Sequence, residues 1–168
     1  KEEMLTQMSF YVDRIAEKLQ TTRKEVEKAL RRQYDGYHFT WPSPDIFNPF
    51  SLLNALQDGA LNNYWFASGT PTYLIEMMRK FDVLPSDLTT MEGGADDFDA
   101  PTENMTSILP LLYQSGYITI KGYDEAFNYY TLSVPNREVR IGLTKALIPS
   151  YVMPNTLKVN NTARRMAQ

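Results

Sequence analysis

Two runs near the end of the chain decide the fold: Tyr117-Ile118-Thr119-Ile120-Lys121 and Tyr129-Tyr130-Thr131-Leu132-Ser133-Val134. Both are rich in β-branched and aromatic residues, which are common in strands. The polar stretch between them, residues 122–128, contains a glycine and suits a turn. The two runs therefore predict a β-hairpin.

Helices are expected on both sides of this hairpin. The preceding helix runs from about Thr102 to Gln114, although Pro110 should bend it or delay its regular start. The last helix is capped by Asn136 and ends before Pro149. Upstream, apolar residues spaced three and four apart predict a first helix. Three more helices begin at capping residues, namely Thr22 with Glu25, Asn48 before Pro49, and Thr70 before Pro71. The pattern predicts a mainly α protein that is α+β overall.

The loops between these helices suggest how the chain is divided. Residues 34–44 and 64–66 are dense in aromatic rings and should form ordered loops, because such rings do not stay in water. Residues 92–101 carry two Gly and three Asp, which predicts an acidic loop. This loop is the expected boundary between a helical domain, 1–95, and a hairpin segment, 96–152, with a linker or tail at 153–168.

Composition fixes the class of protein. Hydrophobic residues make up 43% of the 168 residues and aromatic residues 12%, which excludes a disordered, collagenous or coiled-coil chain. The chain has no Cys, so disulfides and thiolate metal sites are absent, and we expect a cytoplasmic protein. No apolar run is long enough to cross a bilayer. The start at Lys1 suggests a piece excised from a larger protein.

Charge is distributed unevenly along the chain. The net charge of −3 argues against a dedicated nucleic-acid-binding domain. However, basic residues outnumber acidic ones in residues 1–33 and 136–168, whereas acidic residues dominate 34–100. The basic charge therefore lies at the two ends of the chain.

Several catalytic motifs are absent. No Gly is followed by Lys, which excludes a P-loop, and no acidic residue is followed two positions later by Lys, which excludes the local acid-x-Lys element of restriction-like nucleases. With a single His and no Cys, the chain lacks the ligands of a typical zinc site and offers only one residue for a His-based catalytic triad. Asp96, Asp97 and Asp99 could hold a hard cation, but their spacing favours a solvated acidic turn. We predict no catalytic and no metal-ligating residue.

Four separated phrases carry a resemblance to a known family: Tyr34-Asp35-Gly36-Tyr37-His38-Phe39, Asn48-Pro49-Phe50-Ser51-Leu52-Leu53-Asn54, Tyr64-Trp65-Phe66-Ala67-Ser68-Gly69-Thr70-Pro71 and Leu112-Tyr113-Gln114-Ser115-Gly116-Tyr117. Together with Val134-Pro135-Asn136-Arg137-Glu138-Val139-Arg140, they resemble the predicted bacterial AAA-ATPase-like family over about residues 4–152. Members of that family look like a P-loop ATPase core followed by a PD-(D/E)XK nuclease domain.

The resemblance implies that this chain is the middle of such a protein: a helical lid-like bundle followed by a winged-helix-like segment. An ATPase core would precede it and a nuclease domain could follow it in the same polypeptide. ATP and Mg²⁺ would belong to the full-length protein. The expected function is that of a non-catalytic fragment that contributes contacts to the nucleotide cleft and couples neighbouring domains.

Two sets of residues are candidates for nucleotide contact. Gly69-Thr70-Pro71 is similar to the Gly-x-Pro motif that opens a lid helix in related ATPases, where the proline packs on adenine. Alternatively, these residues only start an ordinary helix, with Thr70 as the cap and Pro71 as the first helical residue. Tyr34, Tyr37 and His38 could line the lid side of the cleft, or could form an aromatic loop packed between helices, with His38 merely hydrogen-bonded.

Two other functions stay open. A helix-turn-helix fits the apolar spacing of Ile15, Ala16, Leu19 and Val26, with Arg23 and Lys24 opening the recognition helix; Gln20, Glu25 and Glu27 count against it. The hairpin segment offers a better DNA surface, made of Arg137, Arg140 and Lys145. The third reading is a protein-interaction module that docks the aromatic residues of 34–66 on a partner.

Overall fold

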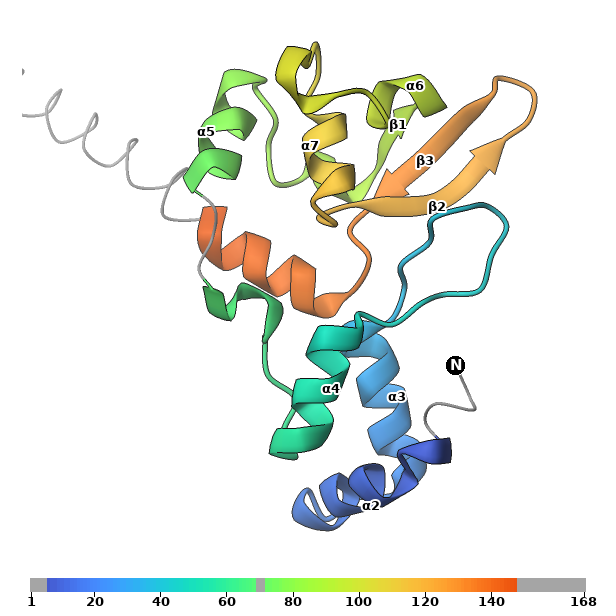
Figure 1. Ribbon diagram of the computed structural model, residues 1–168, viewed down its shortest axis with the longest axis vertical. Helices are drawn as coiled ribbons and strands as arrows, with labels where there is room; N and C mark the ends of the chain where they lie inside the picture. Colours follow the sequence, from blue (N-terminus) through green and yellow to red (C-terminus); the bar gives the residue numbers. More distant parts are fainter. Residues whose placement is uncertain (1–5, 69–71, 148–168) are drawn as a thin grey trace, which may run out of the picture.

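The computed structural model describes residues 6–68 and 72–147. It is mainly helical with one small antiparallel sheet, which confirms the predicted fold class. The chain begins with α2 (Ser9–Lys18), α3 (Arg23–Tyr34) and α4 (Pro49–Asp58). These helices form the lower part of the molecule in Figure 1, and the sheet with its covering helices forms the upper part.

The side-chain caps predicted for this half are present. The Thr22 hydroxyl accepts a hydrogen bond from the Glu25 amide at 3.3 Å, and the Asn48 side chain accepts one from the Ser51 amide at 3.2 Å. Each satisfies an amide that has no partner within its helix. Gly59 ends α4 in the left-handed region, with φ of 65°.

The second half contains short elements arranged around the predicted hairpin. A 3₁₀ turn, η1 (Trp65–Ser68), comes before α5 (Thr72–Lys80) and a second turn, η2 (Asp87–Thr89). Then come β1 (Met91–Gly93), α6 (Ala95–Phe98), a turn η3 (Thr102–Asn104), α7 (Leu109–Gln114), β2 (Thr119–Asp124) and β3 (Tyr129–Ser133). A last helix occupies residues 137–147.

The hairpin is confirmed, and a third strand joins it. β2 and β3 pair antiparallel, and β1 pairs with β3 on the other side, so the strand order is β1-β3-β2. As predicted for Pro110, the helix before the hairpin starts late: residues 102–104 form only a 3₁₀ turn, and α7 begins at Leu109. The Asn136 side chain caps the last helix by accepting from the Val139 amide at 3.1 Å.

The prediction of an acidic loop over residues 92–101 is wrong, because this stretch includes the end of β1 and all of α6. The Asp97 carboxylate accepts a hydrogen bond from the Gly94 amide at 2.8 Å and so caps α6. Phe98 is buried, with its ring centroid 4.7 Å from that of Tyr113 and 5.4 Å from that of Tyr130. A buried ring holds this stretch against the sheet.

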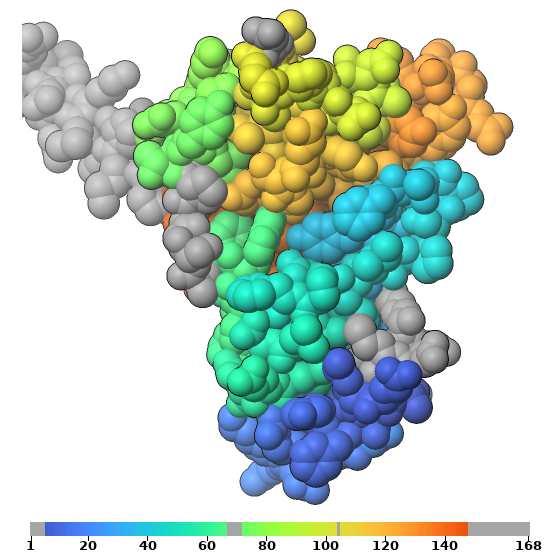
Figure 2. Space-filling view, in the orientation of Figure 1, coloured from blue at the N-terminus to red at the C-terminus, as the bar shows by residue number. Residues whose placement is uncertain are grey.

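Buried apolar side chains form two clusters. The helical core joins α2, α3 and α4 through Val12, Ile15, Ala16, Val26, Leu30, Tyr34, Phe47, Leu52, Ala55 and Leu56. The sheet core joins the sheet, α5, α7 and the last helix, and includes Leu74, Met78, Ile108, Leu112, Ile118, Leu132, Val139, Leu143 and Leu147. Figure 2 shows the corresponding narrow lower and wide upper parts.

The two cores meet along the chain between residues 64 and 65. Tyr64 packs against the helical core and Trp65 against the sheet core. The apolar face of α5, Leu74, Met77 and Met78, is buried in the sheet core. Residues 35–48 span the junction, since Tyr37 belongs to the sheet core and Phe47 to the helical core.

Candidate anion-binding site

The aromatic residues predicted to contact nucleotide are buried in the structure. The Tyr34 hydroxyl donates to the Asn62 carbonyl at 2.8 Å, and the Tyr37 hydroxyl donates to the Gly116 carbonyl at 3.3 Å. Burial raises the pKa of both phenols, which keeps them neutral. His38 is 6% exposed, and its ring nitrogens lie 3.1 Å from the Ser43 hydroxyl and 2.7 Å from an Asp45 carboxylate oxygen.

These residues belong to a clamp that fastens residues 35–48 to the sheet. The Thr119 hydroxyl accepts from the His38 amide at 2.8 Å and donates to the His38 carbonyl at 2.7 Å. The Lys121 ammonium donates to the Gly36 carbonyl. The geometry therefore favours the packed, hydrogen-bonded form of this loop. The other predicted contact, Gly69-Thr70-Pro71, lies outside the described residues.

A buried carboxyl group, Glu138, ties the last helix to the connection between the cores. It is 0% exposed, and its Oε1 accepts from the Trp65 amide at 2.9 Å. Within residues 6–68 and 72–147, neither its Oε2 nor the neighbouring Ser51 hydroxyl has a hydrogen-bond partner. Burial raises the pKa of this carboxyl above its usual value, because the charged form is disfavoured away from water.

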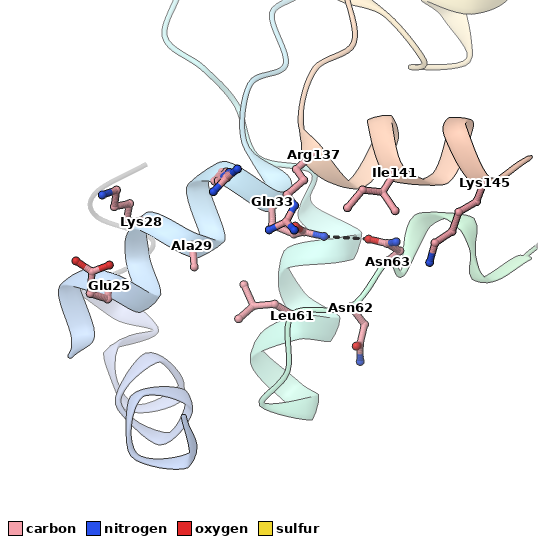
Figure 3. Close-up of a pocket in the computed structure, with 11 residues that line it drawn as sticks. Glu25, Lys28, Ala29, Gln33, Leu61, Asn62, Asn63, Arg137, Ile141 and Lys145 are labelled. Carbon is pink, nitrogen blue, oxygen red and sulfur yellow. Dashed lines mark hydrogen bonds between the residues drawn. The ribbon is translucent and has the colours of Figure 1, made fainter. Parts of the chain in front are cut away.

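A cleft of about 690 Å³ opens beside this junction (Figure 3). One wall is α3, the other is the last helix, and residues 61–63 lie between them. The lining residues are Glu25, Lys28, Ala29, Arg32, Gln33, Leu61, Asn62, Asn63, Arg137, Ile141 and Lys145. The Gln33 side chain, which is buried, donates to the Asn63 side chain at 2.9 Å and links two parts of the lining.

The charge of this cleft is strongly positive. Lys28 and Arg32 come from α3, and Arg137 and Lys145 come from the last helix, whereas Glu25 is the only acid in the lining. All four cationic side chains are exposed. None of the ion pairs found among the described residues includes any of the four. Unpaired cations gathered around one hollow attract anions.

The structure brings together two of the three residues predicted to bind DNA. Arg137 and Lys145 are eight residues apart on one helix, so they lie on one face, with Ile141 between them. Arg140 is exposed but does not line the cleft. Lys28 and Arg32 were missed by sequence reasoning. Their spacing of four marks one face of α3, opposite the buried Val26 and Leu30, but says nothing about which helix that face meets.

The helix-turn-helix alternative finds less support in the geometry. The Arg23 guanidinium donates to the Asp13 carboxylate at 2.7 Å across the turn between α2 and α3. Gln20, at the turn position that usually takes Gly, adopts the left-handed conformation with a φ of 51°, so the backbone of the turn is itself compatible with the motif. The cation expected to open a recognition helix, however, is already paired.

The part of the chain that the structure describes contains no group of three His, Cys, Asp or Glu side chains placed to hold a metal ion. Of the three Asp near α6, Asp97 serves as a helix cap. No helix in the same residues combines the length and the apolar character needed to cross a bilayer.

Comparison with known proteins gives one informative match and no assigned activity. The chain is 31% identical over 125 residues to a protein of Azotobacter chroococcum mcd 1 described as "Uncharacterized protein in vnfD 5'region". The match covers 73% of this chain but only 24% of the relative, so the chain spans about a quarter of that protein's length. No family model and no solved structure matches.

Proposed function

We propose that the chain is a non-catalytic module of a larger AAA-ATPase-like protein, and that it binds phosphate groups in the cleft between α3 and the last helix. One observation carries the binding function: Lys28, Arg32, Arg137 and Lys145 surround the cleft without any acidic partner among the described ion pairs. Four cations against one carboxylate favour an anionic ligand, and Arg suits phosphate oxygens especially well.

Two observations support the role as a coupling module. The relative that the chain matches is far longer than the chain. In addition, the clamp fastens residues 35–48, which lead from α3 to α4, to β2 of the sheet, so a movement of one core is passed to the other. In this proposal an ATPase core lies N-terminal and a nuclease domain C-terminal in a cytoplasmic protein, and ATP with Mg²⁺ is bound by the whole protein.

Nucleotide contact by the lid-like half is a separate part of the proposal. It assigns the Gly69-Thr70-Pro71 segment to the adenine side of an ATP site in the larger protein. Replacing Pro71 by Ala in that protein should weaken ATP binding, measured by titration calorimetry. Unchanged affinity would leave this segment with a helix-starting role alone.

Inorganic tripolyphosphate tests phosphate binding directly, because it offers charge without a base or sugar. Its addition should raise the melting temperature of the chain, and salt should weaken the effect. The paired change Arg137→Ala with Lys145→Ala should abolish it. Arg140→Ala is the matched control, because it removes one exposed arginine from the same helix outside the cleft.

Two results would contradict the proposal. If Arg140→Ala weakens tripolyphosphate binding as much as Arg137→Ala does, the cleft is not the binding site. If the chain alone hydrolyses ATP after stringent purification, with a rate that follows the protein through the columns, the module is not non-catalytic.

An interaction surface is the second candidate function. Phe39, Ile46, Phe50 and Leu53 are 47–66% exposed although they are large and apolar. Two hollows of about 480 Å³ adjoin them and share Phe39, Ile46, Phe47 and Pro49 in their linings. Such a surface suits docking on another domain. Phe39→Ser with Ile46→Ser should weaken association with the rest of the larger protein in a pull-down of separately expressed parts.

A further inference from the structure

We propose that the ligand of the cleft is the phosphodiester backbone of duplex nucleic acid, held without regard to base sequence. The proposal rests on the phosphate-binding function above and names the class of ligand. It follows from the length of the cationic rows, from the side chains that line the cleft, and from the position of the acidic residues.

The cations form two rows that face one hollow. Lys28 and Arg32 are four residues apart on α3, which separates them by about 6 Å along the helix axis. Arg137 and Lys145 are eight apart, or about 12 Å. In Figure 3, Arg137 lies close to Gln33, Lys145 lies toward one side of the cleft, and Lys28 lies toward the other. One strand of a duplex places a phosphate about every 3.4 Å of axis, so a length of about 12 Å offers three or four charges to these cations.

The lining lacks what a nucleotide or a single strand needs. Sites for unpaired bases stack them on aromatic rings. The apolar residues of this lining are Ala29, Leu61 and Ile141, and no aromatic residue is among the eleven in the lining. The Gln33 and Asn63 amides are engaged with each other. The cleft therefore recognises charge and leaves a base without a stacking partner.

Acidic residues restrict how a duplex can approach. Asp124 and Glu125 lie at the tip of the β2–β3 hairpin, and α6 carries Asp96 and Asp97. Figure 1 places α6 at the end of the molecule far from α2 and α3. The acidic tip of the hairpin would repel a phosphate backbone, whereas the wing of a DNA-binding winged helix is basic. Among the described residues, the cleft gathers four cations and a single acid around one hollow.

Fluorescence anisotropy with labelled oligonucleotides tests the proposal. The probes are a DNA duplex of about 20 base pairs, a second duplex of unrelated sequence, one strand alone, and an RNA duplex, because a site for duplex phosphates should bind both duplex types. Four phosphate contacts predict a slope of about −3.6 for log K against log salt, or a loss of about 150-fold between about 50 and 200 mM salt.

The variants distinguish the contribution of the charges that line the cleft from that of other surface charges. Arg137→Ala with Lys145→Ala should make the slope shallower, from about −3.6 to about −1.8. Lys28→Ala with Arg32→Ala should have the same effect. Arg140→Ala removes one charge from the same helix outside the cleft and should leave the slope unchanged, whereas the single variant Arg137→Ala should reduce its magnitude to about 2.7. All five side chains are exposed, and circular dichroism will confirm that each variant is folded.

Each outcome supports or overturns one of the two proposals. Equal affinity for both DNA sequences, weaker affinity for the single strand, and loss in both double variants support duplex binding. Equal or tighter binding of the single strand overturns it. Binding of tripolyphosphate without binding of any duplex overturns this inference alone. If neither tripolyphosphate nor a duplex binds, the proposed phosphate site fails as well.

Discussion

Residues 35–48 and the cationic cleft both lie at the junction of the two cores, but their polar groups are used in opposite ways. In the loop, His38 is buried, its backbone is hydrogen-bonded to Thr119 of β2, and its ring is hydrogen-bonded to Ser43 and Asp45 within the loop. In the cleft, Lys28, Arg32, Arg137 and Lys145 are exposed and unpaired among the described residues. The loop stabilises the fold, whereas the cleft keeps charge available for a ligand.

This difference shows that the residues that stand out in the sequence are not the ones available to bind a ligand. The phrase Tyr34-Asp35-Gly36-Tyr37-His38-Phe39 stands out in the sequence because aromatic residues, Gly and His rarely gather so closely. Its side chains are nevertheless largely occupied by packing. The cleft is built from ordinary surface cations on two distant helices. If this comparison is right, substitutions in the loop should change stability, and substitutions in the cleft should change binding.

The largest effect is expected at Gly36. Its φ is +115°, and a Cβ there would meet the Pro135 carbonyl oxygen at 2.3 Å. Gly36→Ala should therefore lower the free energy of unfolding by about 3 kcal/mol or more, measured by urea denaturation. Gly94→Ala is the control, because its φ is −71° and the nearest atom, at 3.5 Å, is in ordinary contact. A loss of similar size at both positions would contradict the role of the clamp.

The next effect is expected at Thr119. Thr119→Val keeps the shape of the side chain but leaves the His38 amide and carbonyl without their partner. We expect a loss of about 2 kcal/mol in the free energy of unfolding. Thr144→Val removes an exposed hydroxyl that donates to a helix carbonyl at 2.8 Å, and should cost less than about 0.5 kcal/mol. Equal costs would show that the clamp adds nothing.

Glu138 should make stability depend on pH. Because its pKa in the folded state is raised above 4.5, the folded protein holds a proton that the unfolded chain releases. Its contribution is complete below the unfolded pKa and is lost as the pH rises through the folded pKa. Glu138→Gln stays neutral, so it should be more stable than the wild type by about 1 kcal/mol at neutral pH and gain nothing in acid.

If the free energy of unfolding of the wild type and of Glu138→Gln changes in parallel between acid and neutral pH, this prediction is wrong. The phenols that face Glu138 do not titrate in this pH range. Burial raises the pKa of Tyr34, Tyr37 and Tyr64, so all three stay neutral across that range. Remaining titrations are common to both proteins and cancel in the difference.

The smallest change in stability is expected in the cleft. Arg137→Ala with Lys145→Ala should alter the free energy of unfolding by less than about 0.5 kcal/mol, because both side chains are exposed and form no ion pair within residues 6–68 and 72–147. Urea denaturation checks this at the salt concentration used for binding. A loss comparable to that of Thr119→Val would mean that the cleft cations, like the loop, serve mainly to hold the fold.

Local signals predicted much of this structure. The hairpin, the caps at Thr22, Asn48 and Asn136, and the delay caused by Pro110 depend on neighbouring residues. β1 was missed because its pairing is distant: Met91 lies opposite Leu132, and three residues carry too little pattern to reveal a strand. α6 was missed because its single buried ring, Phe98, is held by residues far along the chain.

The candidate site was predictable only on one side. Arg137 and Lys145 share a helix face, so the sequence groups them. Their approach to Lys28 and Arg32 depends on how two cores separated by many residues pack together, which no local pattern encodes. The same limit explains why His38 looked like a possible ligand: its partner Thr119 is 81 residues away.

That separation also sets the order of events during synthesis. The helical core can pack once α4 is made, but Gly36 and His38 wait for partners 85 and 81 residues downstream, respectively. At ribosomal speeds of about 5–20 residues per second, the wait is roughly 4 to 16 seconds. During that time Tyr37 has no sheet core to enter, and its loop exposes aromatic surface. Closure of the clamp is therefore a late event that requires β2 to have been made.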